Sequence, residues 1–425
     1  MLDIQFIRDN ADRVRTAMQQ KGIGDGSLVD QVLEADTERR DLIARTQETQ
    51  TRSNSAAKEI GLLMKEGRKE EAQAAIAENS SLKAELKELE DLQRSAQEKV
   101  DALLLEVPNV PHESVPVGRT PDDNVVALEW GTKTTFDFDA VPHWDLLDTH
   151  GMADFDRGSK VTGAGFPFYI GAGARMQRAL INFFLDEAVS AGYVEIQSPL
   201  MVNEDSARGT GQIPDKEDMM YEATKDGFYM IPTAEVPVTN LHRDEIFSAD
   251  DLPILYCAYT PCFRREAGSY GKDVRGLNRL HQFDKVELVH FVRPADSYQA
   301  LEDLREHAEQ LLRKLELPFR RLLMCTGDMG FTQAKKYDLE VWSAGQARWL
   351  EVSSISNFES FQARRMMIRY RSEPSAKPQI IHTLNGSGLA LPRIMAALLE
   401  NNQQADGSIV LPAALRPYFG ADTIG

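Results

Sequence analysis

The candidate chemistry is concentrated in residues 262–289, CFRREAGSYGKDVRGLNRLHQFDKVELV, where charged side chains accompany two apolar runs that predict strands. Arg264 and Glu266 are two residues apart, so on a strand their side chains leave the same face. Glu287 is on the returning strand, and a hairpin can bring it to that face. One arginine and two carboxylates together can bind a ligand with anionic and cationic groups. The alternative is a salt-bridge cluster on an edge strand, which the charges alone favour.

Three further segments offer polar side chains: PTAEVPVTN at 232–240, EVSS at 351–354 and NGSGLALPRIMAALLEN at 385–401. Glu351 provides the hard oxygen donors that Mg²⁺ takes, although EVSS alone is also typical of a strand end followed by a helix cap. Arg393 is predicted at a helix start after Gly386 and Gly388, where the backbone can approach a phosphate closely. By itself, GSG more often marks a turn.

The scaffold predicted for these segments is of mixed type. A helix is clearest at 173–193, where apolar residues recur at helical spacing and Gly192 provides a stop. It leads into a short strand that ends at Pro199. Further strands are predicted around 228–236, 254–266, 283–292 and 347–356, with helices near 295–315 and 388–402. This mixture favours an α+β domain, an antiparallel sheet flanked by helices.

Residues 27–105 are rich in Ala, Glu, Gln, Lys, Arg and Leu, which is typical of long helices. A reversal near Gly67 predicts two antiparallel helices, an arm on the order of 55 Å long. The second helix should carry an apolar seam of Leu82, Leu86, Leu89, Leu92, Ala96, Val100 and Leu103. A dimerisation coiled coil would have the same pattern. The stretch VPNVPHESVPVG then marks a linker, so we predict domains at 1–108 and 109–425.

The composition excludes several classes of protein. No apolar run of the 425 residues approaches the length that spans a bilayer, and MLDIQFIRDN is unlike a secretory signal, so we expect a cytoplasmic protein without membrane association. Three cysteines without a CxxC and eight histidines without an HxxxH give no disulfide framework or local zinc signature. A net charge of −18 disfavours nucleic-acid binding through the overall field, but local basic patches can still bind RNA.

Taken together and in this order, the segments resemble the active-site motifs of class II aminoacyl-tRNA synthetases, specifically the seryl-tRNA synthetase family of the bacterial type. Residues 262–289 resemble the second class II motif, 385–401 the third, and the helix and strand that end at Pro199 the first. The arm and linker match too, so the resemblance covers essentially the whole chain. It implies ATP-dependent activation of L-serine, transfer to tRNA(Ser) and also tRNA(Sec), Mg²⁺ as cofactor and a homodimer.

The resemblance also implies individual roles. Arg264 matches the arginine that holds the ATP α-phosphate and the reacting carboxylate, and Arg393 the one that binds the γ-phosphate, so these two are the expected catalytic residues. Glu266 matches the acceptor for the adenine amino group, and Phe283 the ring stacked on adenine. Ser387 is expected to bond the serine hydroxyl, which would reject analogues lacking it by about four orders of magnitude.

The full sets follow from the same resemblance. ATP-binding positions are expected at Arg264, Arg265, Glu266, Phe283, Glu351, Val352, Ser353, Ser354 and Arg393. Serine-binding positions are expected at Thr233, Ala234, Glu235, Arg264, Glu287 and Ser387, and Mg²⁺ ligands at Glu351 and Ser354.

For the RNA partner, the resemblance implies that the basic segment 267–279 meets the acceptor end and that the arm grips the long variable arm of tRNA(Ser). Arg265, Ala390 and Pro392 depart from the usual motif patterns. Two alternatives are a non-catalytic RNA-binding paralogue and an amino-acid ligase acting on a carrier protein. The presence of Arg264, Glu351 and Arg393 disfavours the first, and the long arm disfavours the second.

Overall fold

The structure is a computed structural model that describes residues 1–214, 218–266 and 275–425. The chain divides into two compact units, Met1–Pro108 and Asn109–Gly425. Within the described ranges, no helix is both long and apolar enough to cross a bilayer. Most of the basic segment expected to meet tRNA, residues 267–274, lies outside the described residues.

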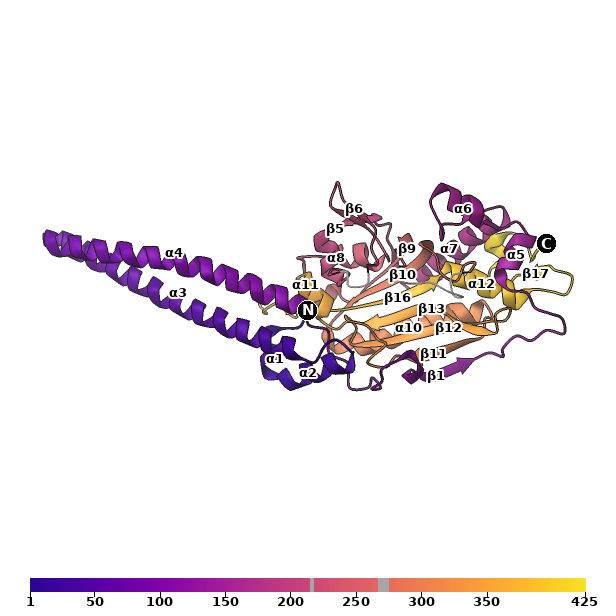
Figure 1. Cartoon of the computed structure of the whole chain (residues 1–425), viewed down its shortest axis with the longest axis horizontal. Coiled ribbons are helices and arrows are strands. Elements are labelled where there is room, and N and C mark those ends of the chain that lie inside the picture. Colours follow the sequence, from indigo (N-terminus) through magenta and orange to yellow (C-terminus); the bar gives the residue numbers. More distant parts are fainter. Residues whose placement is uncertain (215–217, 267–274) are drawn as a thin grey trace. The chain divides into compact units, whose positions relative to one another are not determined.

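The first unit is helical, with α1 (Ile4–Asp9), α2 (Ala11–Gln20), α3 (Ser27–Lys65) and α4 (Lys69–Glu106). The last two helices lie side by side and form the predicted antiparallel arm (Figure 1). Between them the chain reverses at Gly67, whose φ of +79° is in the left-handed region that glycine adopts without steric cost.

The seam between α3 and α4 changes character along the arm. Leu42, Leu89 and Ala96 form an apolar cluster. Nearer the turn, the Ser53 hydroxyl donates to Asn79 Oδ1 at 2.8 Å, and both side chains are buried. A hydrogen-bonded polar pair therefore interrupts the apolar contact.

One residue predicted for the apolar seam, Leu92, lies outside it. Leu92 is 53% exposed, whereas Leu82, Leu89 and Val100 are buried as expected. The heptad position after Leu89 belongs to Gln93, so Leu92 is turned by about 100° from the seam.

The second unit is built on a large sheet. Its strands are β1 (Val125–Trp130), β4 (Val194–Glu195), β9 (Ile254–Phe263), β10 (Gln282–Val292), β11 (Phe319–Leu323), β12 (Lys335–Ser343), β13 (Arg348–Asn357) and β16 (His382–Ala390). In the described residues they form eight strands in the order β1-β11-β12-β13-β16-β10-β9-β4 (Figure 1). Neighbours are antiparallel, except that β4 pairs parallel with β9 at the edge.

Shorter elements surround this sheet. The helices are α5 (His143–Thr149), α6 (Phe155–Val161), α7 (Ala172–Ser190), α8 (Glu204–Thr210), α9 (Glu235–Asn240), α10 (Ser297–Lys314), α11 (Phe361–Arg365), α12 (Leu391–Asn402) and α13 (Arg416–Phe419). The remaining strands are β2 (Ala153–Asp154), β3 (Phe168–Tyr169), β5 (Met201–Asn203), β6 (Glu222–Ala223), β7 (Phe228–Met230), β8 (Ile246–Ser248), β14 (Arg369–Arg371), β15 (Gln379–Ile380), β17 (Ile409–Val410) and β18 (Thr423–Ile424). The predicted α+β class, with a helix-flanked and largely antiparallel sheet, is confirmed.

The two faces of strand β10 have different surroundings: one packs on the hydrophobic core, and the other carries charged residues. Leu288 points into the main core, which α7, α10 and α12 supply with most of their buried side chains. Glu287 leaves the opposite face. Further along that opposite face, Val289 and Phe291 enter a second apolar cluster. The charged residues therefore occupy one end of a face whose other end is packed.

Gly386 and Gly388 differ from the prediction. They lie inside β16 and not in a turn before a helix. A Cβ on Gly386 would come within 2.2 Å of Leu304 Cδ2 on α10, and a Cβ on Gly388 within 3.2 Å of Leu288. These glycines allow close packing on the core side of the sheet, while Ser387 between them faces the other way.

Candidate active site

A cavity of about 680 Å³ opens on the face of the sheet that carries Glu287. Its walls come from β10, β13 and β16, from the chain that follows β9, from the turn before α9 and from the first turn of α12. All of the residues expected in the site line it except Ala234 and Arg265; the lining ones are Thr233, Glu235, Arg264, Glu266, Phe283, Glu287, Glu351, Val352, Ser353, Ser354, Ser387 and Arg393. Ala234 is packed in the second apolar cluster, and Arg265 pairs with Asp218 at 3.2 Å.

Arg264 and Glu266 do not lie on a strand as predicted, although both side chains reach the cavity. Strand β9 ends at Phe263. The Arg264 N–H still donates across the hairpin to the His281 carbonyl oxygen at 2.9 Å, but the Arg265 N–H turns to the Met219 carbonyl oxygen at 2.8 Å. Glu266 then has a φ of +51°. A change of backbone direction, and not the alternation of side chains along a strand, brings the two side chains to one cavity.

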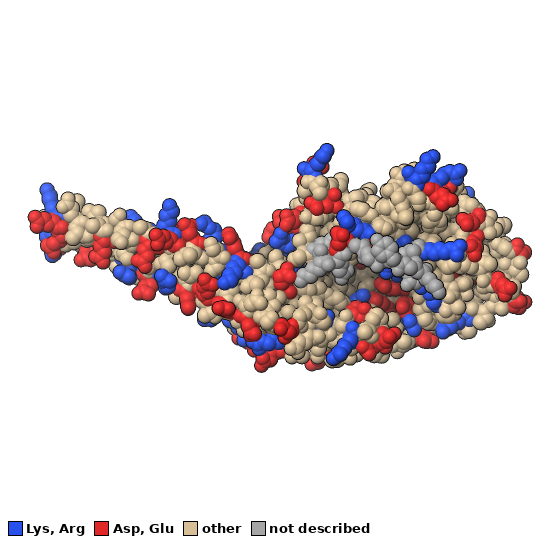
Figure 2. All heavy atoms as spheres, in the orientation of Figure 1, with Lys and Arg blue, Asp and Glu red and all other residues tan. Residues whose placement is uncertain are grey.

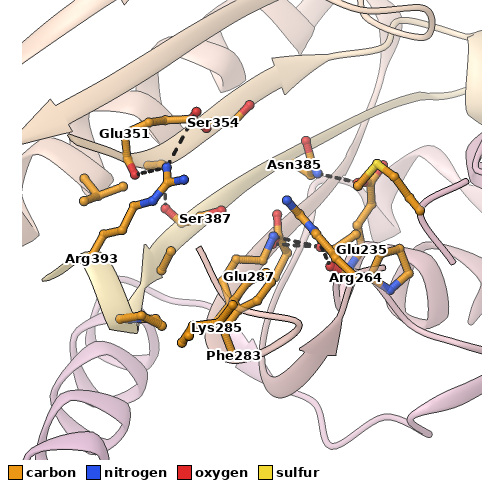
Figure 3. Close-up of a pocket in the computed structure, with 18 of the residues that line it drawn as sticks. Glu235, Arg264, Phe283, Lys285, Glu287, Glu351, Ser354, Asn385, Ser387 and Arg393 are labelled. Carbon is orange, nitrogen blue, oxygen red and sulfur yellow. Dashed lines mark hydrogen bonds and ion pairs between the residues drawn. The ribbon is translucent and has the colours of Figure 1, made fainter. Parts of the chain in front are cut away.

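One end of the cavity holds a buried polar group around Glu287 (Figure 3). Thr233 Oγ1 donates to Glu287 Oε2 at 3.0 Å, and the Lys285 ammonium contacts both Glu287 Oε2 and Thr233 Oγ1. Glu287 is 1% exposed, and its second oxygen, Oε1, has no hydrogen-bond partner among the described residues. A buried carboxylate oxygen without a donor is costly unless a ligand supplies one.

Glu235 lies beside this group and is also buried. Its Oε1 accepts from Gln362 Nε2 at 2.5 Å. Its Oε2 accepts from Asn385 Nδ2 at 2.7 Å (Figure 3). Burial and, after it, the charge of Glu287 raise the pKa of Glu235 to about 7. Two carboxylates in one buried pocket favour a cationic ligand, which would relieve both effects.

Arg264 lies against an aromatic ring in the middle of the cavity. Its guanidinium carbon is 5.1 Å from the centroid of Phe283, and its Nε donates to the Pro232 carbonyl oxygen at 3.3 Å. On the rim, Arg279 Nη1 donates to Glu266 Oε2 at 2.5 Å. This region combines a flat apolar surface with fixed cations.

Arg393 occupies the other end, in the first turn of α12. Its Nε donates to the Asn278 carbonyl oxygen at 2.9 Å, and its Nη1 donates to the Glu351 carbonyl oxygen at 2.7 Å (Figure 3). Burial lowers the pKa of Arg393, but an arginine stays charged at any physiological pH.

Glu351 and Ser354 both reach the cavity although they are three residues apart on β13. Regular alternation would place them on opposite faces. The register between β12 and β13 shifts between the Leu339–Ser353 and Glu340–Glu351 pairs, and this bulge reverses the alternation. The cavity walls partly desolvate Glu351, which disfavours its charge, although its side chain is 47% exposed. Nearby cations, Lys336 and Arg393 foremost, outweigh this effect and hold the pKa of Glu351 below the usual value.

The carboxylate and hydroxyl oxygens of Glu351 and Ser354 are of the kind that Mg²⁺ takes. In the part of the chain that the structure describes, no cluster of three or more His, Cys, Asp or Glu side chains could hold a metal unaided. These two residues fit an ion that receives its remaining ligands from a bound phosphate and from water.

Several residues of the site were missed in the sequence. Lys285 and Asn385 lie two residues before Glu287 and Ser387 on the same strands, so strand alternation could have identified them. Gln362 and Asn278 had no sequence signal, because their contacts join segments far apart in the chain.

Comparisons with known proteins agree over the whole chain. Residues 1–111 match the seryl-tRNA synthetase N-terminal domain, and residues 219–402 match the tRNA synthetase class II core domain (G, H, P, S and T). A serine–tRNA ligase from Salinibacter ruber is 61% identical over 425 residues, which cover 100% of this chain and 99% of that protein. One from Exiguobacterium sibiricum is 52% identical over 421 residues, 99% of this chain and 98% of that protein.

A solved structure is similar over the same extent. The crystal structure of seryl-tRNA synthetase from Pyrococcus horikoshii complexed with ATP gives a TM-score of 0.95 at 36% identity, covering 100% of this chain and 99% of that one. The chain therefore belongs to the seryl-tRNA synthetase family.

Proposed function

We propose that the cavity performs the serine–tRNA ligase reaction, in which ATP activates L-serine and the seryl group passes to tRNA(Ser). The observation that carries this proposal is the convergence of Glu235, Glu287, Arg264, Glu351 and Arg393 on one cavity. These residues provide two buried carboxylates for an ammonium and two arginines for phosphates, which is the charge distribution of serine beside ATP.

Serine binds at the Glu287 end. Glu287 Oε1, which has no hydrogen-bond partner in the described part of the chain, accepts a hydrogen bond from the substrate, and the adjacent Glu235 balances its ammonium. Ser387 lines the same end and contacts the serine hydroxyl. Lys285 holds Glu287 and Thr233 in place through its contacts to both. Alanine and glycine lack the hydroxyl and would leave buried polar groups unpaired.

ATP binds across the remaining cavity. Adenine stacks on Phe283, Glu266 accepts from its amino group, Arg264 contacts the α-phosphate and Arg393 the γ-phosphate. Arg264 is suited to this because the Phe283 ring and the Pro232 carbonyl hold its guanidinium on the cavity wall. Glu351 and Ser354 would hold Mg²⁺, which supplies charge neutralisation for the polyphosphate when bound.

The first step is an in-line displacement at phosphorus. A serine carboxylate oxygen forms a bond to the α-phosphorus, the bond from that phosphorus to the bridging oxygen breaks, and pyrophosphate leaves. Arg264 and Arg393 stabilise the negative charge, and positioning supplies much of the remaining rate. In the second step, the oxygen of a terminal ribose hydroxyl of tRNA forms a bond to the seryl carbonyl carbon, and the bond from that carbon to the phosphate oxygen breaks. AMP leaves with the bonding electrons, and the hydroxyl proton passes to the released phosphate or to water.

The arm is the proposed tRNA-binding element of domain 1–108, and 109–425 the catalytic domain. On the face shown in Figure 2, acidic and basic side chains are interspersed along α3 and α4. This mixture supports recognition of RNA shape and scattered backbone contacts, and not attraction to a uniform basic surface. The proposal includes tRNA(Sec) as a second substrate, a homodimer and action in the cytoplasm.

The test is serine-dependent exchange of labelled pyrophosphate into ATP, followed by charging of tRNA(Ser). We expect both activities, with exchange that requires Mg²⁺ and is not supported by alanine or glycine. Absence of exchange with serine would contradict the proposal and favour a non-catalytic RNA-binding protein. Exchange without tRNA charging would instead favour a ligase that acts on a carrier protein.

A further inference from the structure

A buried polar network lies behind the Arg393 end of the cavity and is centred on His143 and Glu400, both 0% exposed on their side chains. His143, the first residue of α5, donates from Nδ1 to Glu400 Oε1 at 2.7 Å, and its backbone N–H donates to the same oxygen at 2.9 Å. The other Glu400 oxygen accepts from the Ser343 hydroxyl and from the Gly345 N–H at 3.1 Å. Burial would raise the pKa of Glu400, but these hydrogen bonds outweigh it and lower that pKa.

The second ring nitrogen of His143 faces the chain that returns toward β10. Its Nε2 accepts from the Leu277 N–H at 2.9 Å. The imidazole therefore has one arrangement of protons that satisfies both contacts, with hydrogen on Nδ1 and a lone pair on Nε2. Gly276, with φ of +65°, allows this approach, because a Cβ there would lie 2.4 Å from His143 Nε2.

The segment 275–278 contacts α5 at a second place, through Arg275. The Arg275 guanidinium carbon lies 4.7 Å from the centroid of the Trp144 ring, and Arg275 Nη2 lies 3.7 Å from Asp145 Oδ1. The side chain of Asn278 is held in turn by Gln346, whose Oε1 accepts from Asn278 Nδ2 at 2.9 Å and whose Nε2 donates to Glu400 Oε1 at 3.0 Å.

This network ends on a residue of the proposed ATP site. The Asn278 carbonyl oxygen accepts from Arg393 Nε at 2.9 Å. Arg393 and Glu400 lie about two turns apart on α12. The helix thus holds residues 276–278 twice, directly through Arg393 and indirectly through Glu400 and His143.

We propose that His143 and Glu400 are positioning residues for ATP binding: they hold residues 276–278 so that the Asn278 carbonyl fixes the direction of the Arg393 guanidinium. The inference rests on the proposed function, since it assumes that Arg393 contacts ATP. Misplacement of such a group by a fraction of an ångström weakens its interaction with phosphate, without any loss of charge from the site.

The test uses the full chain and measures the dissociation constant for ATP by calorimetry and the KM for serine in pyrophosphate exchange. His143→Ala removes the anchor, and Gly276→Ala displaces the imidazole without removing any charged group. Both should weaken ATP binding by about tenfold and change the KM for serine by less than about twofold.

Two controls separate positioning from loss of stability. Gly151 has a φ of +58°, and no atom of the described residues lies within 4 Å of its Cβ position, so Gly151→Ala introduces similar backbone strain without a clash. Leu146 is a core residue of the same helix as His143, so Leu146→Ala lowers the melting temperature without touching the network. Both controls should bind ATP within about twofold of the parent chain.

A double-mutant cycle gives the sharpest outcome. In an Arg393→Ala background, His143→Ala should weaken ATP binding by less than about a further twofold, because the group that it positions is gone. Full additivity would overturn the inference, as would parent-like ATP binding by both His143→Ala and Gly276→Ala, or an equal loss in Leu146→Ala. A parent chain that binds no ATP would overturn the proposed function together with the inference.

Discussion

The guanidinium of Arg264 lies over the ring of Phe283, with 5.1 Å between the guanidinium carbon and the ring centroid. Arg264 belongs to the chain that has just left β9, and Phe283 to β10. The contact joins the two sides of the hairpin where the chain leaves β9, and it holds a cation beside a flat apolar surface. In the proposed reaction the same pair would meet the phosphate and the base of one nucleotide.

Arg264→Ala should lower serine-dependent pyrophosphate exchange by at least about a thousandfold, because it removes a fixed cation from the reacting phosphate. The melting temperature should change little, since the side chain is only partly buried. Arg265→Ala is the matched control, as the neighbouring arginine pairs with Asp218 away from the cavity. Normal exchange in Arg264→Ala, with loss in Arg265→Ala, would reverse the assignment of the two arginines.

Serine affinity should depend on pH through Glu235, whose pKa burial raises to about 7. Below that pH the carboxyl gains a proton and no longer balances the serine ammonium, which stays charged. The KM for serine should therefore rise as pH falls from about 7 to 5.5, by up to about tenfold per unit, while the KM for ATP changes little. Glu235→Gln should raise the KM and remove its pH dependence. A flat KM in the parent chain would contradict this role.

Glu351→Gln should increase the Mg²⁺ concentration needed for half-maximal exchange by about tenfold or more, since an amide is a weaker ligand than a carboxylate. Glu340→Gln is a suitable control: Glu340 pairs with Glu351 across the ladder but forms its ion pair with Arg320. Both variants should have similar melting curves. If their Mg²⁺ titrations superimpose, Glu351 is not a ligand.

Shortening the arm should separate the two half-reactions. Replacing residues 46–86 by a short glycine linker keeps the cluster of Leu42, Leu89 and Ala96. Pyrophosphate exchange should stay within about twofold of the full chain. The kcat/KM for tRNA(Ser) should fall by about a hundredfold, because contacts to the RNA phosphate backbone dominate affinity and the shortened arm would lose them. Unchanged charging by the shortened chain would show that the arm does not bind tRNA.

A dimer is expected to be stable at micromolar concentration in sedimentation experiments. Val194 on edge strand β4 and the nearby Leu200 and Met201 are exposed apolar side chains, of the kind that an interface covers. Val194→Asp should shift the equilibrium toward monomer, while Val161→Asp, also at an exposed valine, should not. A monomeric parent chain would remove the dimer from the proposal.

Elements with strong local patterns were predictable from the sequence. The long helices α3 and α4, the reversal at Gly67 and strand β10 follow from composition and periodicity. The bulge in β13 and the departure of the chain at Arg265 did not, because each depends on a partner strand or a distant carbonyl group.

The same distinction holds for the site. The sequence motifs at 262–289 and 351–354 identified residues such as Arg264 and Glu351, which line the same cavity. Residues that support the cavity-lining side chains through hydrogen bonds, such as Gln362 and Glu400, have no local sequence signature. Only the tertiary fold connects them, so the residues that face the ligand were predictable from the sequence, whereas the residues that support them were not.

The Ser53–Asn79 hydrogen bond also has a mechanical consequence for the arm. If α4 slid along α3 by one heptad, the tip would move by about 10 Å, and the apolar residues would still meet apolar residues. Such a slide would leave a buried hydroxyl and amide unmatched, at a cost of about 1–3 kcal/mol each. The pair therefore sets a single alignment of the two helices, so the arm would keep one length in its proposed contact with tRNA.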